Sequence, residues 1–218
     1  MARSHLHADI LRAADEHAGV ASKIAGVVLN PPLWAIACHR AAHFLWRNDM
    51  LLIPHALKVL GRVASGVEID PSAAIGPGLL IVHGSGVTLE SGVRIGPRAT
   101  LFQGVGIGRR FSSSLPDGPP ALGEEVTIYA GAKVLGPVRI GDRCRIGANA
   151  VVTRSFPDDT TITGVPGRST GRYAAPSSTA AEGRVVCVTT GRTAPAVSAG
   201  AFACEGAERP QPSPIGPQ

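Results

Sequence analysis

The residue best suited to chemistry in this 218-residue chain is His83, in the stretch LIVHGSGVTLE. Histidine ordinarily titrates near neutral pH, so a histidine side chain can take the proton from a hydroxyl group during a reaction. A base of this kind works with an acidic group that fixes its tautomer, and Glu68 lies fifteen residues before His83. Taken locally, a structural or solvated histidine and a solvated edge carboxylate remain the alternatives.

Apolar residues that recur every six positions indicate the elements that would hold this pair. One track starts at Ile69 and continues through Ile75, Ile81, Val87, Val93, Ala99 and Val105, and a second contains Leu89, Ile95, Leu101 and Ile107. After an interruption the two tracks resume as Val126, Ala132, Val138, Cys144 and Ala150, and as Leu122, Ile128, Val134, Ile140, Ile146 and Val152. A period of six is neither helical nor a simple alternation.

Short strands joined by a turn at every sixth residue predict a parallel β-helix, in which each coil buries its apolar edge against the next. Glycine (27 residues) and proline (18 residues) supply the turns, and aromatic residues make up only 4% of the chain. A β-sandwich, the alternative, would place turns every 8–12 residues in a less regular phase. Three hexads make one coil of eighteen residues, so Glu68 and His83 are expected on neighbouring coils.

The sequence divides into three regions around this repeat. Residues 1–64 are predicted to be helical, because apolar residues recur at helical spacing after the break at Asn30-Pro31-Pro32. Residues 65–172 form the predicted β-helix domain, and the phase is lost in a loop at 109–120. Residues 173–218 are rich in Ala, Pro, Ser, Thr and Gly, which favours a flexible tail over a segment that caps the coil.

Charge and composition argue against several classes of function. A net charge of +5 suits an anionic ligand, but the arginines are dispersed, so a nucleic-acid surface is not expected. The cysteines form no Cys-x-x-Cys pair, and no carboxylate accompanies His39 and His43, so neither a zinc site nor a disulfide framework is predicted. No leader or membrane span is evident, and we expect a cytoplasmic protein.

The motifs GVEIDPSAAIG and VHGSGV, with GVPGR further on, resemble those of bacterial serine O-acetyltransferases. These enzymes belong to the hexapeptide-repeat acyltransferases, whose β-helix is left-handed. The resemblance spans residues 66–168 and implies acetyl transfer from acetyl-CoA to L-serine, giving O-acetylserine for cysteine biosynthesis. It also implies His83 as catalytic base, Glu68 as its acidic partner, and a homotrimer or dimer of trimers with active sites at subunit junctions.

Acetyl-CoA needs a groove in which its thin pantetheine arm can lie against exposed backbone groups. Small residues along the coil edge and basic residues near its end are the candidates for this role. The candidate contacts are Gly106, Ala130, Ala132, Lys133, Ala148, Arg154, Pro166 and Arg168. Lys133, Arg154 and Arg168 are the candidates for the phosphates, and backbone N–H groups from Gly104 to Gly106 are the candidates for an oxyanion site.

Two departures from the family concern the acceptor. Val82 stands where the family has an aspartate, and Gly118-Pro119-Pro120 stands where it has Arg-His-Pro; both family features help to hold the amino acid. Arginine binds a carboxylate through a bidentate pair that glycine and proline cannot replace, and Arg109 or Arg110 is a possible substitute. A sugar, polysaccharide precursor or natural-product hydroxyl is therefore an alternative acceptor, and a non-catalytic scaffold is a further alternative.

Overall fold

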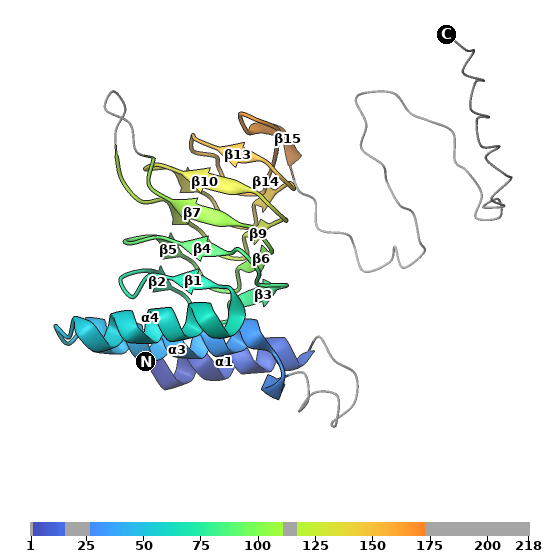
Figure 1. The fold of residues 1–218 in the computed structure, drawn as a ribbon. Coiled ribbons are helices and arrows are strands. Elements are labelled where there is room, and N and C mark those ends of the chain that lie inside the picture. The colour runs from blue at the N-terminus through green and yellow to red at the C-terminus, as the bar shows by residue number, and fades with distance from the viewer. Residues whose placement is uncertain (1, 16–26, 111–116, 173–218) are drawn as a thin grey trace, which may run out of the picture. The chain divides into compact units, whose positions relative to one another are not determined.

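The computed structural model describes residues 2–15, 27–110 and 117–172. Three helices precede a coil of short strands, as Figure 1 shows. Within the described residues, no helix is long and apolar enough to cross a membrane. Positions 111–116 of the predicted loop and the predicted tail at 173–218 lie outside the described residues.

The three described helices are α1 (Ala2–Asp15), α3 (Pro31–Trp46) and α4 (Leu52–Ser65). Helix α3 begins where the sequence predicts a break: the Asn30 side chain caps it by accepting a hydrogen bond from the Leu33 N–H at 3.2 Å, and Pro31 occupies the first helical position. Helix α4 ends at Gly66, whose φ of 71° turns the chain into the first strand.

The strands follow at hexad spacing and form three parallel sheets that wrap one core. The five-stranded sheet contains β1 (Glu68–Ile69), β4 (Thr88–Leu89), β7 (Gly106–Gly108), β10 (Lys133–Leu135) and β13 (Val151–Val152). The four-stranded sheet contains β2 (Ala74–Ile75), β5 (Arg94–Ile95), β8 (Ala121–Leu122) and β11 (Arg139–Ile140). The six-stranded sheet contains β3 (Leu80–Val82), β6 (Thr100–Phe102), β9 (Thr127–Ile128), β12 (Arg145–Ile146), β14 (Thr160–Thr163) and β15 (Arg168–Arg172), of which β15 alone pairs antiparallel.

Each coil contributes its apolar tracks to a single interior. The two residues per hexad that the repeat marks as apolar are almost fully buried, for example Val105 and Ile107 at 0% and 1% exposure. Burial of about 25 cal/mol per Å² of apolar surface stabilises the stack as each coil covers the one before it. The prediction of a parallel β-helix built from hexapeptide repeats is confirmed.

One detail of the predicted repeat is wrong. The predicted track runs from Ile81 directly to Val87, but the register pairs Ile69 with Leu89 and Ile81 with Leu101. Leu89 therefore takes the place in its coil that Ile69 has in the first. Two extra residues lie in the corner between β3 and β4, and the segment that they lengthen carries His83.

A buried ion pair attaches the helices to the first coil. Arg40 of α3 donates from Nε to Asp9 of α1 at 3.0 Å, and their side chains are 6% and 0% exposed. The Arg40 guanidinium also donates to the carbonyls of Ile75 (2.5 Å) and Gly76 (2.7 Å), and Asp9 accepts from the Leu79 N–H at 2.8 Å. Each buried charge is thus fully partnered, as burial requires.

Candidate active site

His83 occupies the lengthened corner between β3 and β4, and its side chain is exposed. Its φ is 54°, a left-handed conformation that non-glycine residues adopt infrequently. The following residue, Gly84, is buried against Val67, and a Cβ placed on it would also lie only 3.0 Å from Pro32 Cγ. Close packing under Gly84 therefore leaves the His83 ring outside the coil.

The same corner carries small residues on the next coils. Gly86, Gly104 and Gly131 stack along it, all with positive φ, and Asn149 continues the column. Hydrogen bonds between coils hold the column together, from the Gly104 N–H to the Ser85 carbonyl at 2.9 Å and from the Gly131 N–H to the Gln103 carbonyl at 2.8 Å. The result is a column of glycines, ending in Asn149, that leads along the coil away from His83.

Glu68 lies on β1, the strand that follows helix α4. The Gly86 N–H donates to the Gly66 carbonyl at 3.1 Å and the Glu68 N–H to the Val87 carbonyl at 2.9 Å, so the end of the His83 corner stacks on the start of β1. The Glu68 carboxylate, however, forms ion pairs with Lys58 (3.0 Å) and Arg62 (3.0 Å) of α4. Among the described residues, no hydrogen bond joins it to His83.

Lys58 and Asp70 extend these ion pairs into a network. Lys58 lies 3.4 Å from Asp70, which also accepts hydrogen bonds from the Ser72 hydroxyl (2.6 Å) and N–H (3.0 Å). Desolvation alone would lower the pKa of Lys58, but the bonds and charges of Glu68 and Asp70 outweigh it and raise that pKa. Desolvation likewise opposes ionisation of Asp70, yet Ser72 and Lys58 hold its pKa below the ordinary value. Lys58 and Asp70 therefore both keep their charges at neutral pH.

Lys133 lies on the same sheet, in a column of paired residues with Thr88 and Gly106. Its ammonium group donates to the Gly104 carbonyl, and its Cδ would lie 2.9 Å from a Cβ placed on Gly106. The lysine side chain thus lies over Gly106 and points to Gly104, one turn nearer to His83, and not to the C-terminal end of the β-helix.

Two of the predicted oxyanion donors are already engaged. The Gly104 N–H donates to the Ser85 carbonyl at 2.9 Å, and the Gly106 N–H donates to the Ala132 carbonyl at 3.0 Å. Because bonds between coils use these two groups, neither is free to face a reacting carbonyl in this structure. The Lys133 ammonium is the donor that lies beside them.

The remaining residues predicted to contact acetyl-CoA fall into two groups. Ala132 is fully buried, and its N–H and carbonyl both bond within the coil, so its assignment as a direct contact does not fit the structure. The others are wholly or partly exposed: Ala130 and Ala148 lie in the small-residue corner, Arg154 in the turn after β13, and Pro166 and Arg168 near the end of the coil. Arg154 lies 5.2 Å from the centre of the Phe156 ring.

The two arginines of the 109–120 loop, Arg109 and Arg110, lie in its described part. Arg109 pairs with Asp117 at 3.2 Å, while Arg110 lies over Gly136 and its Nε is buried with no hydrogen-bond partner in the described part of the chain. Gly118 and Pro120 are buried, so neither presents a polar group in place of Arg-His. Arg109 is therefore already partnered in this structure.

Sequence reasoning missed an aromatic pair beside His83. Val82 pairs with Phe102 on the next coil, and Phe102 stacks on Tyr129 with ring centres 5.3 Å apart and planes inclined by 26°. The hexad pattern marks only the inward positions, so the outward neighbours of a coil are visible only once the register is known. Lys58 and Arg62 were missed for a similar reason, because they belong to a helix outside the repeat.

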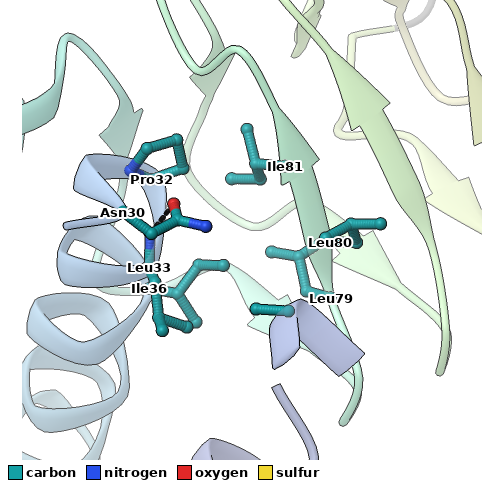
Figure 2. A pocket seen from close by; sticks show the side chains of 8 residues that line it. Asn30, Pro32, Leu33, Ile36, Leu79, Leu80 and Ile81 are labelled. Atoms are coloured by element: carbon teal, nitrogen blue, oxygen red, sulfur yellow. Dashed lines mark hydrogen bonds between the residues drawn. The ribbon is translucent and has the colours of Figure 1, made fainter. Parts of the chain in front are cut away.

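Figure 2 shows a small pocket between helix α3 and strand β3. Its lining is apolar apart from the Asn30 cap and comprises Ala13, Asn30, Pro32, Leu33, Ile36, Leu79, Leu80 and Ile81. No titratable side chain lines it, so it lacks the groups that acid–base chemistry requires. Among the described residues, no cluster of three or more His, Cys, Asp or Glu side chains is placed to hold a metal ion.

Comparisons with known proteins agree with this architecture. The family described as "Bacterial transferase hexapeptide (six repeats)" matches residues 119–154. The chain is 42% identical over 138 residues to a serine acetyltransferase of Synechococcus elongatus, covering 63% of this chain and 56% of that protein. It is 38% identical over 160 residues to a serine acetyltransferase of Helicobacter pylori strain J99, covering 72% of this chain and 92% of that protein.

A solved structure extends the similarity to three dimensions. The serine acetyltransferase of Brucella abortus strain S19 in complex with coenzyme A superposes with a TM-score of 0.72 at 28% identity. The match covers 78% of this chain and 68% of that one. The similarity therefore includes most of the described helices and coils.

Proposed function

This chain belongs to the serine acetyltransferase family, and on that basis we propose that it transfers the acetyl group of acetyl-CoA to the hydroxyl group of L-serine. The observation that carries the proposal is His83: an exposed histidine on a lengthened corner whose end stacks on the start of β1, the strand of Glu68, and from which a column of small residues leads along the coil.

In the proposed reaction His83 takes the proton of the acceptor hydroxyl as its oxygen attacks the thioester carbonyl. The carbon–sulfur bond then breaks, and the proton passes from His83 to the departing thiolate. The two substrates react in one ternary complex, so positioning supplies much of the rate and no covalent enzyme intermediate is formed. Glu68 orients His83: a carboxylate has about four lone-pair sites, so it can accept from the imidazole while bound to Lys58 and Arg62.

The donor fits the corner that leads away from His83. The small residues Gly104, Ala130 and Ala148 leave room there for the pantetheine arm, and the exposed Arg154 and Arg168 provide positive charge for the phosphates. The placement of Lys133 over Gly106 supports a different role from the one first expected. We assign Lys133 to the thioester end, where its ammonium group can stabilise the developing oxyanion.

A ring-bearing hydroxyl compound is a second candidate acceptor. Val82 offers no charge to an amino group, and the stacked Phe102 and Tyr129 continue from it along the outer face of the sheet. Aromatic faces of this kind suit a sugar or other cyclic acceptor better than a free amino acid. Family membership favours L-serine as the acceptor.

We further expect the chain to form a homotrimer or dimer of trimers in the cytoplasm.

Thiol release from acetyl-CoA tests the proposal. We expect L-serine to stimulate release by the wild-type chain and His83→Asn to lower the rate by about a hundredfold or more, the usual range for loss of a general base. Asparagine tolerates the positive φ at this corner, so the fold should survive. His55→Asn, at an exposed histidine of α4, is the matched control and should retain activity. Equal activity of wild type and His83→Asn would refute the role of His83.

A further inference from the structure

Glu68 lies on strand β1, but the side chains that hold its carboxylate belong to helix α4. Lys58 and Arg62 are four residues apart on α4, so they project from the same face of the helix. Each lies 3.0 Å from a different oxygen of Glu68. The helix therefore grips the carboxylate from both oxygens, in the segment just before the chain enters the first strand.

Partial burial distinguishes this cluster from an ordinary surface ion pair. Lys58, Glu68 and Asp70 are only 23%, 27% and 18% exposed, whereas Arg98, paired with Glu124 and Glu125 elsewhere on the coil, is 53% exposed. Exposed pairs contribute little because water screens the charges and the side chains lose entropy. A partly buried network with several partners has fewer alternative arrangements.

Asp70 anchors the network of Lys58, Arg62, Glu68 and Asp70 to the coil. Asp70 is tied to Ser72 through the hydroxyl and the N–H of that residue, and the Ser72 hydroxyl in turn accepts from the Gly92 N–H of the next coil at 3.1 Å. Asp70 thereby holds Lys58, which lies 3.4 Å away, and Lys58 holds Glu68. Arg62 closes the other side of the carboxylate, although its own side chain is 64% exposed.

We propose that Lys58 and Arg62 are positioning residues for acetyl transfer: they hold the ionised Glu68 carboxylate on the coil next to His83, with lone pairs left to orient the imidazole. The inference rests on the proposed function, since it assigns Glu68 to His83. Without the two cations, the flexible Glu68 side chain would visit several rotamers, and the imidazole would be held in its reactive orientation for a smaller fraction of the time.

The test is a set of steady-state measurements on Arg62→Gln and Lys58→Met. We expect kcat to fall about tenfold in each, equivalent to ~1.4 kcal/mol of lost transition-state stabilisation. KM for acetyl-CoA and L-serine should stay within about twofold, because neither residue is assigned a substrate contact. Arg62→Lys should restore most of kcat, and Arg98→Gln, which removes an arginine of similar exposure from another ion pair, should leave activity unchanged.

A double-mutant cycle separates positioning from a merely structural effect. In a Glu68→Gln background, Arg62→Gln should lower kcat no further, because the carboxylate that it positions is gone. Thermal unfolding of each variant should stay within a few degrees of wild type. If Arg62→Gln lowered kcat by the same factor in the Glu68→Gln background as in wild type, the inference would be overturned. A rise in KM without a loss of kcat would overturn it as well.

The outcomes also separate the inference from the function on which it rests. A wild-type chain that releases thiol with L-serine, together with an unchanged Arg62→Gln and an unchanged Lys58→Met, would overturn the positioning role alone. A wild-type chain that transfers acetyl to no hydroxyl acceptor would overturn the proposed function, and the role of the two cations with it.

Discussion

At the scale of single residues, the chemistry depends on what surrounds the reacting hydroxyl. In the proposed reaction His83 supplies the base and Lys133 a cation, but Val82, the residue immediately before His83, offers only a methyl surface. An L-serine acceptor presents an ammonium group that must lose water in the site. A valine side chain cannot accept a hydrogen bond from that ammonium group, so L-serine should bind weakly.

Val82→Asp should therefore strengthen L-serine binding. We expect KM for L-serine to fall about fivefold to tenfold, since a carboxylate next to an ammonium contributes roughly 1 kcal/mol or more. Val151→Asp, a half-buried outward valine on β13, is the control and should leave this KM unchanged. A Val82→Asp variant with an unaltered KM for L-serine would show that the ammonium group does not approach this position.

The site itself was predictable only where it followed the repeat. The hexad period placed Glu68 and His83 about one coil apart in sequence, and the structure stacks Gly86 and Val87, at the end of the His83 corner, on Gly66 and Glu68. The partners of Glu68 were not predicted, because Lys58 and Arg62 belong to a helix outside the repeat, and the hexad spacing does not show which face of that helix packs on β1. Ala132 was misassigned because its small side chain suits both an open edge and a tight core, and the structure buries it.

At the scale of elements, turns packed backbone to backbone set the spacing of the coils. Gly96 follows β5, and its N–H donates to the Leu122 carbonyl at 2.9 Å. A Cβ at this position would meet the carbonyl of Gly123 on the next coil and lie 2.8 Å from the Glu124 nitrogen. These are backbone atoms of a stacked coil, so they cannot move aside as a side chain would.

Gly96→Ala should consequently lower the free energy of unfolding by about 1–3 kcal/mol, the usual cost of overpacking. Urea denaturation measures this change directly, and Ser91→Ala, at an exposed serine nearby, provides the control with an expected change below ~0.5 kcal/mol. A Gly96→Ala variant as stable as wild type would show that neighbouring coils can separate without cost.

The elements show how far periodicity can be followed. Six-residue spacing predicts every coil, because each strand must direct the same two positions inward. It cannot detect the two extra residues at the His83 corner, since Val87 and Leu89 are both apolar and both buried, at 0% and 1% exposure. The phase change is visible only in the pairing of Ile69 with Leu89.

At the scale of the whole molecule, stability should depend on a histidine that the reaction does not use. His39 of α3 is 3% exposed, and neither ring nitrogen has a hydrogen-bond partner among the described residues. Burial, reinforced by the charges of Arg40 and His43, lowers the pKa of His39 to about 3 from 6.5. The folded chain therefore keeps this ring neutral where the unfolded chain protonates it.

The sign of the pH dependence follows from proton binding. Between pH 6.5 and pH 3 the unfolded state holds more protons at His39, so stability falls as the pH falls through this range. From pH 7 to pH 5 this one group should remove about 2 kcal/mol. In urea denaturation at both pH values, His39→Leu should lose less stability than wild type by that amount, and His55→Leu should behave like wild type. Parallel losses in wild type and His39→Leu would contradict the assignment.

The product of the reaction tests the proposed function most directly. The measurement is mass spectrometry of the reaction of the wild-type chain with acetyl-CoA and L-serine, with His83→Asn as the paired sample. The proposed function predicts O-acetyl-L-serine from the wild-type chain and a trace at most from the variant. Unmodified L-serine in both samples, alongside acetylation of a sugar hydroxyl in a parallel reaction, would contradict it.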